Sequence, residues 1–462
     1  MTGRGWVGAV GVGVAALVWG ACREEERVHP EPGGLLEVHA DSADAATHLP
    51  DAGVSPTDAG ADAGLRDAGV LDAGAPDAGV DAGTIVLPSA SGWQFFGPQH
   101  GGPREVYGVS SDATGNLWVA GGDEGLFLLA PGATSFRRFT VADGLTPYVD
   151  AAGVQPQKVL SVRGGPAHTV FVGYEGRFGG LDLNDPPDLL KSGDADKVVF
   201  NGAGITVSHF DIATPPGDPN YPTGRDLVRT INRILYDRAS GDVWFGGNHG
   251  VALWHGTYKR IQEHQHAAIN GYTGTGAYTL LSGDWYGIGL DPSGDLWFGG
   301  GHRLARLQFG ANRSFWGPVE PIIDVWPDAV EDDGRPDQRT DDFVQDLAVA
   351  SNGAVFIGSI PNGLAVVSPG ATVASFFDKR LFVDPKVTAL EIDPADGSVW
   401  VGHIYGGLTR LQGGQYVHYS LDVFGEQLIE GAVPDIQSDV VGGQRRILVA
   451  FGAGAIGVYT GK

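Results

Sequence analysis

GNLWVAGG at residues 115–122 joins a polar turn to an apolar residue, a tryptophan, two more apolar residues and a pair of glycines. Six similar phrases follow along the chain, at 168–173, 241–247, 294–300, 353–358, 397–402 and 446–452. Their central residues lie about 55 positions apart on average and are Trp118, Phe171, Trp244, Trp297, Phe356, Trp400 and Val449. A repeat of this length, made of short strands and glycine turns, is typical of a β-propeller.

Each phrase is followed within a few residues by a second apolar run, at 125–129, 179–183, 250–254, 303–307, 363–367, 406–411 and 454–459. In the first repeat we expect an inner strand within 106–110, a buried second strand at 117–120, a third at 126–129 and an outer strand at 136–140. One such sheet leaves both faces uncovered, so the repeats must stack and bury the central aromatic residues between neighbouring blades.

The end of the chain predicts how the ring closes. The seventh repeat stops after its third strand, at 457–459, and has no outer strand of its own. The segment GWQFFG at 92–97 resembles the outer strand FRRFT at 136–140. We therefore expect residues 92–96 to complete blade seven, giving an all-β, seven-bladed propeller closed by an N-terminal strand.

The phrase resembles the two-component regulator propeller repeat, D-x-x-G-x-[LV]-W-[IV]-G, of the WD40/YVTN-like propellers. The best copies lie at 112–118, 241–244, 291–297 and 393–400, whereas repeats two, five and seven have Phe or Val at the anchor. The resemblance covers about residues 92–462 and implies the architecture. In that family such propellers often serve as extracytoplasmic sensing domains ahead of a membrane helix and a signalling module. We expect neither here, because the chain ends inside the propeller.

Residues 1–22 have the pattern of an export signal, with Arg4 before an apolar, glycine-rich stretch at 6–18. The ending Trp19-Gly-Ala-Cys22 resembles a bacterial lipoprotein cleavage site, although that family prefers Leu or Val where this chain has Trp19. The resemblance implies a lipid on Cys22 and a location in the cell envelope. The alternative is an ordinary cleaved signal followed by an incidental cysteine.

Residues 23–85 are poor in large apolar side chains and contain the triplet Asp-Ala-Gly seven times between 51 and 83. This composition buries too little surface to offset backbone entropy, so we expect a disordered acidic linker. Calcium binding by these carboxylates is the alternative, but the spacing lacks the ligand density of known calcium loops. The predicted domains are thus a signal at 1–22, a linker at 23–85 and a propeller at 86–462.

The chain carries 55 acidic and 30 basic residues, a formal net charge of -25. Nucleic-acid binding needs a basic patch, so we expect no nucleic-acid partner, and contact with the membrane through the lipid anchor only. No nucleophile elbow, phosphate-binding loop, H-E-x-x-H or C-x-x-C motif occurs. The sequence predicts no cofactor.

In a propeller, the connection between blades and the turn between strands two and three share one face. The predicted long connections at 141–157, 211–229, 262–284 and 318–342 lie there, and the opposite turns are short except at 184–203. We take this insertion-bearing face as the binding face. Its candidate ligand-binding residues are Asp123, Glu175, Arg177, His249, Trp285, His302, Trp326, His403 and Tyr405.

Two hypotheses follow for function. The first is an envelope-anchored module that binds or senses a protein, peptide or glycan without catalysis. The second is a lyase- or hydrolase-like enzyme that uses His249, His302 and His403 as acids, bases or metal ligands. Streptogramin lyases are propeller enzymes of this kind, but the chain lacks their His…Glu-x-His arrangement in any clear form, and we predict no metal site. We expect the histidines of 263–266 and the acidic run at 331–342 to be solvated loop residues.

Overall fold

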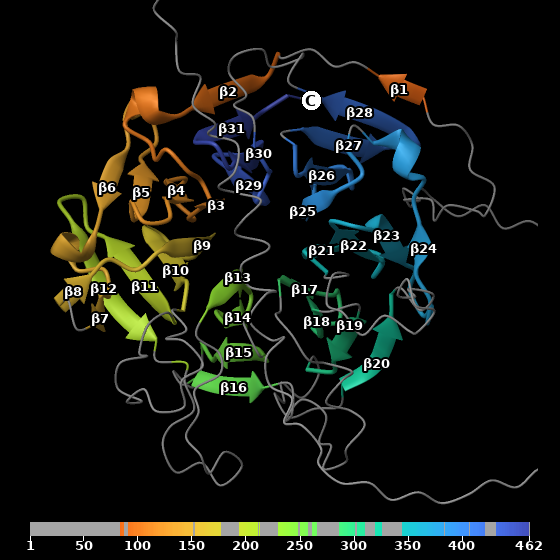
Figure 1. Cartoon of the computed structure of the whole chain (residues 1–462), viewed down its shortest axis with the longest axis horizontal. Coiled ribbons are helices and arrows are strands. Elements are labelled where there is room, and N and C mark those ends of the chain that lie inside the picture. Colours follow the sequence, from red (N-terminus) through yellow and green to blue (C-terminus); the bar gives the residue numbers. More distant parts are fainter. Residues whose placement is uncertain are drawn as a thin grey trace, which may run out of the picture.

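The structure is a computed structural model, and it describes residues 84–86, 91–150, 153–176, 194–210, 212, 230–247, 250–256, 261–265, 286–300, 303–309, 319–325, 344–382, 384–405, 407–420 and 431–461. Seven antiparallel sheets stand around a central axis (Figure 1). The predicted seven-bladed propeller is therefore confirmed. No helix among the described ranges is both long enough and apolar enough to cross a membrane.

Each of the first four blades is built from strands that follow one another along the chain, from the axis outward. Blade one has β3 (Gly108–Ser111), β4 (Leu117–Ala120), β5 (Leu126–Leu129) and β6 (Arg137–Phe139). Blade two has β9 (Val159–Gly164), β10 (Thr169–Tyr174), β11 (Ala195–Phe200) and β12 (Ile205–Phe210). Blade three has β13 (Ile231–Tyr236), β14 (Val243–Gly247), β15 (Gly250–Trp254) and β16 (Ile261–Gln265). Blade four has β17 (Gly287–Leu290), β18 (Leu296–Gly300), β19 (Arg303–Leu307) and β20 (Val319–Asp324).

Blades five to seven complete the ring. Blade five has β21 (Asp346–Val349), β22 (Val355–Ser359), β23 (Gly363–Val367) and β24 (Ser375–Phe376). Blade six has β25 (Val387–Ile392), β26 (Val399–His403), β27 (Leu408–Gln412) and β28 (Gln415–Tyr419). Blade seven has β29 (Asp435–Val441), β30 (Gln444–Phe451), β31 (Ala455–Tyr459) and β2 (Trp93–Phe96). Outside the blades lie the hairpin β7 (Tyr148–Asp150) and β8 (Gly153–Gln155) and the 3-10 turns η2 (Pro98–His100), η3 (Val141–Asp143) and η5 (Lys379–Leu381).

The seven predicted anchor residues all lie in the second strand of a blade. Trp118 is fully buried between blades one and two, in one cluster with Val162 and Val172 of the neighbouring sheet. Its indole Nε1 donates to Asp112 Oδ2 at 2.9 Å, which explains the aspartate that opens the repeat. Gly115 between them has a φ of 84°, and a Cβ there would lie 2.6 Å from Val441 of blade seven.

The predicted closure by the N-terminal strand is confirmed. β2 lies beside β31 (Figure 1) and pairs with it antiparallel, and Trp93 is the partner of Tyr459. A further strand, β1 (Thr84–Val86), pairs in parallel with β28 at the outer edge of blade six, which the sequence did not predict. This strand begins two positions before residue 86, where we expected the propeller to start.

Three expected segments are placed differently. The third strand of blade two is β11, which lies within the stretch 184–203 that we expect to be a turn. The strand expected at 179–183 lies outside the described residues. The two glycines that open 179–183 match the repeat pattern, but the β-branched residues of β11 and β12 supply the paired strands. Likewise, 262–284 and 318–342 do not begin as loops, because β16 and β20 reach into them as outer strands.

Candidate functional site

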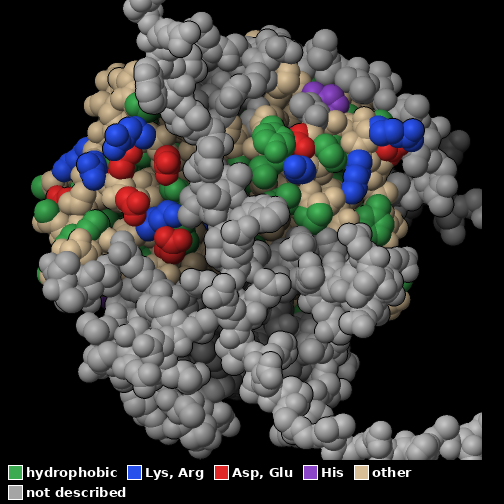
Figure 2. Space-filling model, viewed as in Figure 1, with side chains coloured by type: hydrophobic (Ala, Val, Ile, Leu, Met, Phe, Trp, Pro, Cys, Tyr) green, Lys and Arg blue, Asp and Glu red, His purple; other side chains and the backbone are tan. Residues whose placement is uncertain are grey.

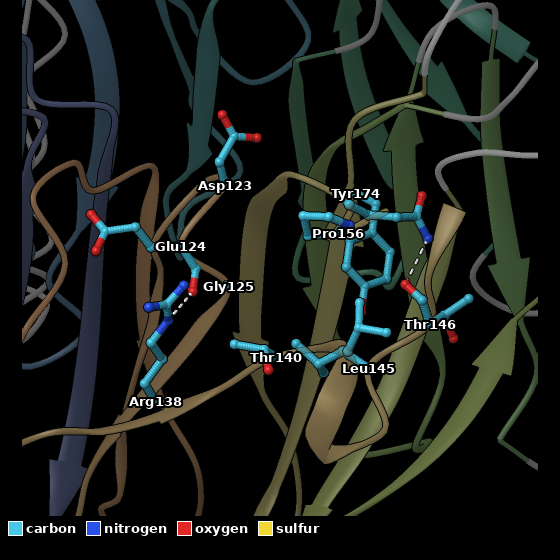
Figure 3. A pocket seen from close by; sticks show the side chains of 11 residues that line it. Asp123, Glu124, Gly125, Arg138, Thr140, Leu145, Thr146, Pro156 and Tyr174 are labelled. Atoms are coloured by element: carbon cyan, nitrogen blue, oxygen red, sulfur yellow. Dashed lines mark hydrogen bonds between the residues drawn. The ribbon is translucent and has the colours of Figure 1, made fainter. Parts of the chain in front are cut away.

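A groove of about 270 Å³ lies between blades one and two (Figure 3). One wall is the turn between β4 and β5, and the other is the connection from β6 to β9 together with the end of β10. These two kinds of segment share a face of a propeller, so the groove opens on the predicted insertion-bearing face. It is lined by Asp123, Glu124, Gly125, Arg138, Thr140, Val141, Leu145, Thr146, Pro156, Gln157 and Tyr174.

A buried hydrogen-bond network holds the far wall of the groove in place. The hydroxyl of Tyr174 donates to Asp196 Oδ2 at 2.6 Å, and Thr146 Oγ1 donates to Asp196 Oδ1 at 2.7 Å. Nδ1 of His209 lies 2.8 Å from the same Oδ1. Burial, and then the charge of Asp196, raise the pKa of Tyr174, so its phenol stays protonated as a donor. The wall is therefore preformed and rigid.

The near wall carries charged groups. Asp123 is exposed and makes no hydrogen bond or ion pair with any residue that the structure describes. By contrast, Glu124 Oε1 accepts from the backbone N–H of Arg104 at 2.9 Å, and its carbonyl accepts from Arg138 Nε at 2.5 Å. Figure 2 shows acidic and basic side chains interspersed over blade one. The carboxylate of Asp123 is thus available to a ligand.

Glu175 lies beside this groove, directly after β10 of blade two. Its carboxylate lies 3.4 Å from Lys158 Nζ, which also lies 4.9 Å from the ring centre of Tyr107. The amide of Glu175 donates to the carbonyl of Lys158 at 3.0 Å. Asp123 and Glu175 were both predicted from sequence, and the structure brings them to the same junction between blades.

Two further candidates lie elsewhere, on blade six. Tyr405 is 68% exposed, and Lys386 Nζ lies 5.1 Å from its ring centre. His403, expected at an exposed turn, is instead fully buried at the end of β26. The other candidates, Arg177, His249, Trp285, His302 and Trp326, lie outside the described residues.

The surroundings of His403 exclude it from surface chemistry. Its Nε2 lies 2.8 Å from Thr409 Oγ1, which lies 3.0 Å from Nδ1 of His418. The ring of Phe382 packs against it at 5.9 Å. Burial lowers the pKa of His403 to about 3, so the imidazole is neutral at physiological pH. No group of three His, Cys, Asp or Glu side chains within the described ranges is placed to hold a metal ion.

The inner strands carry a second polar centre that the sequence did not indicate. Nη1 of Arg233 in blade three lies 2.6 Å from Asp435 Oδ1 in blade seven, and its Nη2 lies 2.9 Å from Asp346 Oδ2 in blade five. Asp435 Oδ2 accepts from the amide of Val109 in blade one at 3.0 Å. Arg233 and Asp435 together therefore link the inner strands of blades one, three, five and seven across the central channel.

Two carboxyl groups on the inner strands, those of Glu391 and Asp346, make the stability of the folded protein depend on pH. Burial raises the pKa of Glu391 to about 7 and that of Asp346 to about 6, against the opposing effect of the arginines. Between their ordinary values and these raised values, the folded state binds more protons than the unfolded state. Stability therefore decreases as pH rises through that window. We expect the Tm to fall from about pH 5 to about pH 8, corresponding to a loss on the order of 3 kcal/mol.

The Glu391→Gln variant identifies the source of this fall. In this variant the Tm is expected to fall only below about pH 6, where Asp346 titrates, and to stay constant between about pH 6 and about pH 8. Thermal unfolding at a series of pH values, followed by tryptophan fluorescence, measures both curves. An unchanged slope in the variant would contradict the assignment to Glu391.

No protein-family model matches the chain, and no curated protein resembles it in sequence. Solved structures resemble it in fold. One is the extracellular domain of BT3049, described as a hybrid two component system, from B. thetaiotaomicron, with a TM-score of 0.52 and 14% identity over 80% of this chain. The match spans 42% of that protein's length. The structure of YCF48 bound to D1 peptide has a TM-score of 0.50 and 13% identity, over 82% of this chain and 100% of that one.

A third similar structure is Saccharomyces cerevisiae Sqt1, with a TM-score of 0.48 and 13% identity, over 82% of this chain and 99% of that one. At such identities the likeness of these structures shows the fold alone. The likeness to the first two structures supports the propeller architecture that the repeat predicts, and one of these two is an extracellular domain. Membership of the two-component regulator propeller family stays a prediction.

Proposed function

We propose that this chain is an extracytoplasmic binding module that captures a protein or peptide in the groove between blades one and two, without catalysis of its own. The observation that carries the proposal is the groove itself. It is preformed by the Asp196 network and has apolar side chains such as Leu145 and Pro156 in its lining. At its rim lies the carboxylate of Asp123, which has no bonded partner among the described residues. A few polar groups around an apolar pocket are typical of a ligand site.

The chemistry of the groove favours a particular kind of peptide. An apolar side chain can enter between Leu145, Pro156 and Tyr174, and a neighbouring Lys or Arg of the peptide can pair with Asp123. The structure of YCF48 with a peptide offers a precedent for a propeller as a peptide receptor. The buried, neutral His403 gives no support to the enzyme hypothesis.

Selection of displayed random peptides on the immobilised full chain tests this proposal. We expect enriched peptides with a basic residue next to an apolar one, and an affinity about tenfold weaker for the Asp123→Lys variant because the rim charge is reversed. Asp123 is exposed, so the variant is expected to fold. The control, Asp378→Lys, reverses a carboxylate at the start of η5, between blades five and six, and should bind like the wild type.

Three outcomes would count against the groove. Selection could yield no peptide above background, enriched peptides could bind the Asp123→Lys variant unchanged, or the control could lose binding as strongly. A glycan array on the same protein distinguishes a glycan ligand from a peptide ligand. Glycan binding without peptide binding would contradict the proposed partner.

We further propose that Cys22 carries a lipid that anchors the module in the cell envelope, with residues 23–85 as a tether. The proposal rests on the residues at 1–22, which lie outside the described ranges. In a bacterial host, the wild type is expected in the membrane fraction, and Cys22→Ser in the soluble fraction. Intact mass should place the mature N-terminus at Cys22 with added acyl chains. A Cys22→Ser variant that stays with the membrane would overturn the anchor.

A further inference from the structure

A second cavity, of about 160 Å³, lies on the axis of the propeller. The inner strands of six blades, β9, β13, β17, β21, β25 and β29, line it. Four ionisable side chains are among the lining residues: Arg163, Arg233, Asp346 and Glu391. The volume is below the roughly 300–1,000 Å³ of drug-sized pockets, so it fits a molecule of a few heavy atoms.

The two arginines of this cavity differ in their bonding. Arg233 holds Asp346 and Asp435 and also donates from Nε to the carbonyl of Tyr286 at 3.3 Å. The side chain of Arg163 makes no hydrogen bond or ion pair with any residue that the structure describes. A guanidinium has five N–H donors, and the half-buried side chain of Arg163 lines the cavity with them. The charge of Glu391 acts on Arg163, but no carboxylate of the described residues is bonded to its guanidinium directly.

The carboxylate of Glu391 accepts hydrogen bonds at only one of its two oxygens within the described residues. Its Oε1 accepts from the amide of Ser438 at 3.0 Å and from the hydroxyl of Ser438 at 2.5 Å. Its Oε2 has no partner within the described part of the chain. Blades two and six, which carry Arg163 and Glu391, stand on nearly opposite sides of the ring. Among the described residues, Arg163 and one oxygen of Glu391 thus face the same cavity from opposite walls, where their charges act on each other without a direct bond.

We propose that the axial cavity binds a small zwitterion, a free amino acid, with its carboxylate on Arg163 and its ammonium group on Glu391. A simple anion placed there would meet Asp346 and Glu391, and a simple cation would meet both arginines. A molecule that carries both charges satisfies both walls at once. This site is separate from the groove between blades one and two, and the inference does not depend on the proposed peptide partner.

Calorimetric titration of the full chain tests the site at about pH 8, where the carboxyl group of Glu391 is ionised. The ligands are each of the common amino acids at millimolar concentration, with acetate and methylammonium as probes of one charge each. We expect at least one amino acid to bind and to raise the Tm, and both single-charge probes to bind roughly tenfold more weakly or less. If no amino acid binds, or if acetate alone binds as well as the amino acids, the proposal is overturned.

Two conservative variants locate the ligand. Arg163→Gln and Glu391→Gln are each expected to weaken amino-acid binding by roughly tenfold or more, while the exposed Arg380→Gln serves as the matched control and should leave it unchanged. If one axial variant does not fold, the other still decides, since each removes one end of the contact. Binding that survives the substitution in a folded variant places the ligand elsewhere and refutes the assignment. Peptide selection on the same variants reports on the groove independently.

Discussion

Replacing Arg233 with methionine is expected to lower the free energy of unfolding by about 3–5 kcal/mol. The substitution removes both ion pairs, at 2.6 Å and 2.9 Å, and leaves the carboxyl groups of Asp435 and Asp346 in the channel without their cation. Each carboxyl must then be protonated or remain as an unpaired buried charge. Urea unfolding, followed by tryptophan fluorescence at neutral pH, measures the loss.

Two comparisons make this result specific. Arg380→Met removes an exposed arginine that pairs with Asp378, and it should change stability by less than about 0.5 kcal/mol. Adding Asp346→Asn and Asp435→Asn to Arg233→Met should recover part of the loss, because no buried charge is then left alone. An Arg233→Met protein as stable as the Arg380→Met protein would show that the channel network does not stabilise the ring.

The propeller fold could be predicted from the sequence because the blades repeat the same short-range pattern of turn and strand residues. The aspartate, glycine and tryptophan of the first repeat form a turn whose carboxylate accepts from the indole, and all three lie within seven positions of one another. Even the closing strand could be predicted, since Trp93 and Phe95 alternate like an outer strand and the last repeat lacked one. The third strand of blade two was predicted in the wrong place, because a glycine-rich run after the repeat matches the pattern better than the residues of β11 do.

The site was accessible only in part. Asp123 follows directly from the repeat, because it lies in the turn after the glycine pair. The channel does not, since Arg233 and Asp435 lie 202 residues apart and no local pattern links them. The sequence feature that could have indicated these ion pairs is the presence of a charged residue in several of the inner strands. His403 was misplaced because the partners that bury it, Thr409 and His418, come from the next two strands.

Substituting Trp93 with alanine is expected to destabilise the protein by about 3 kcal/mol and to open the ring at blade seven. The indole packs against Tyr459 at 5.0 Å, Tyr419 at 5.4 Å and Trp400 at 6.1 Å, so one side chain joins β2 to blades six and seven. Losing these contacts exposes the edge of β31, whose backbone groups then lack a partner.

Limited proteolysis and urea unfolding distinguish this effect from a general loss of packing. The Trp93→Ala protein should be cut within residues 93–107 at protease concentrations that leave the wild type intact, because the closing strand detaches before the ring unfolds. Trp93→Phe should retain most of the stability, since an aromatic ring still fills the site. Tyr405→Ala, at a side chain that is 68% exposed, is the control for losing an aromatic residue. Cleavage first within blades three or four would show that β2 is not what holds the propeller closed.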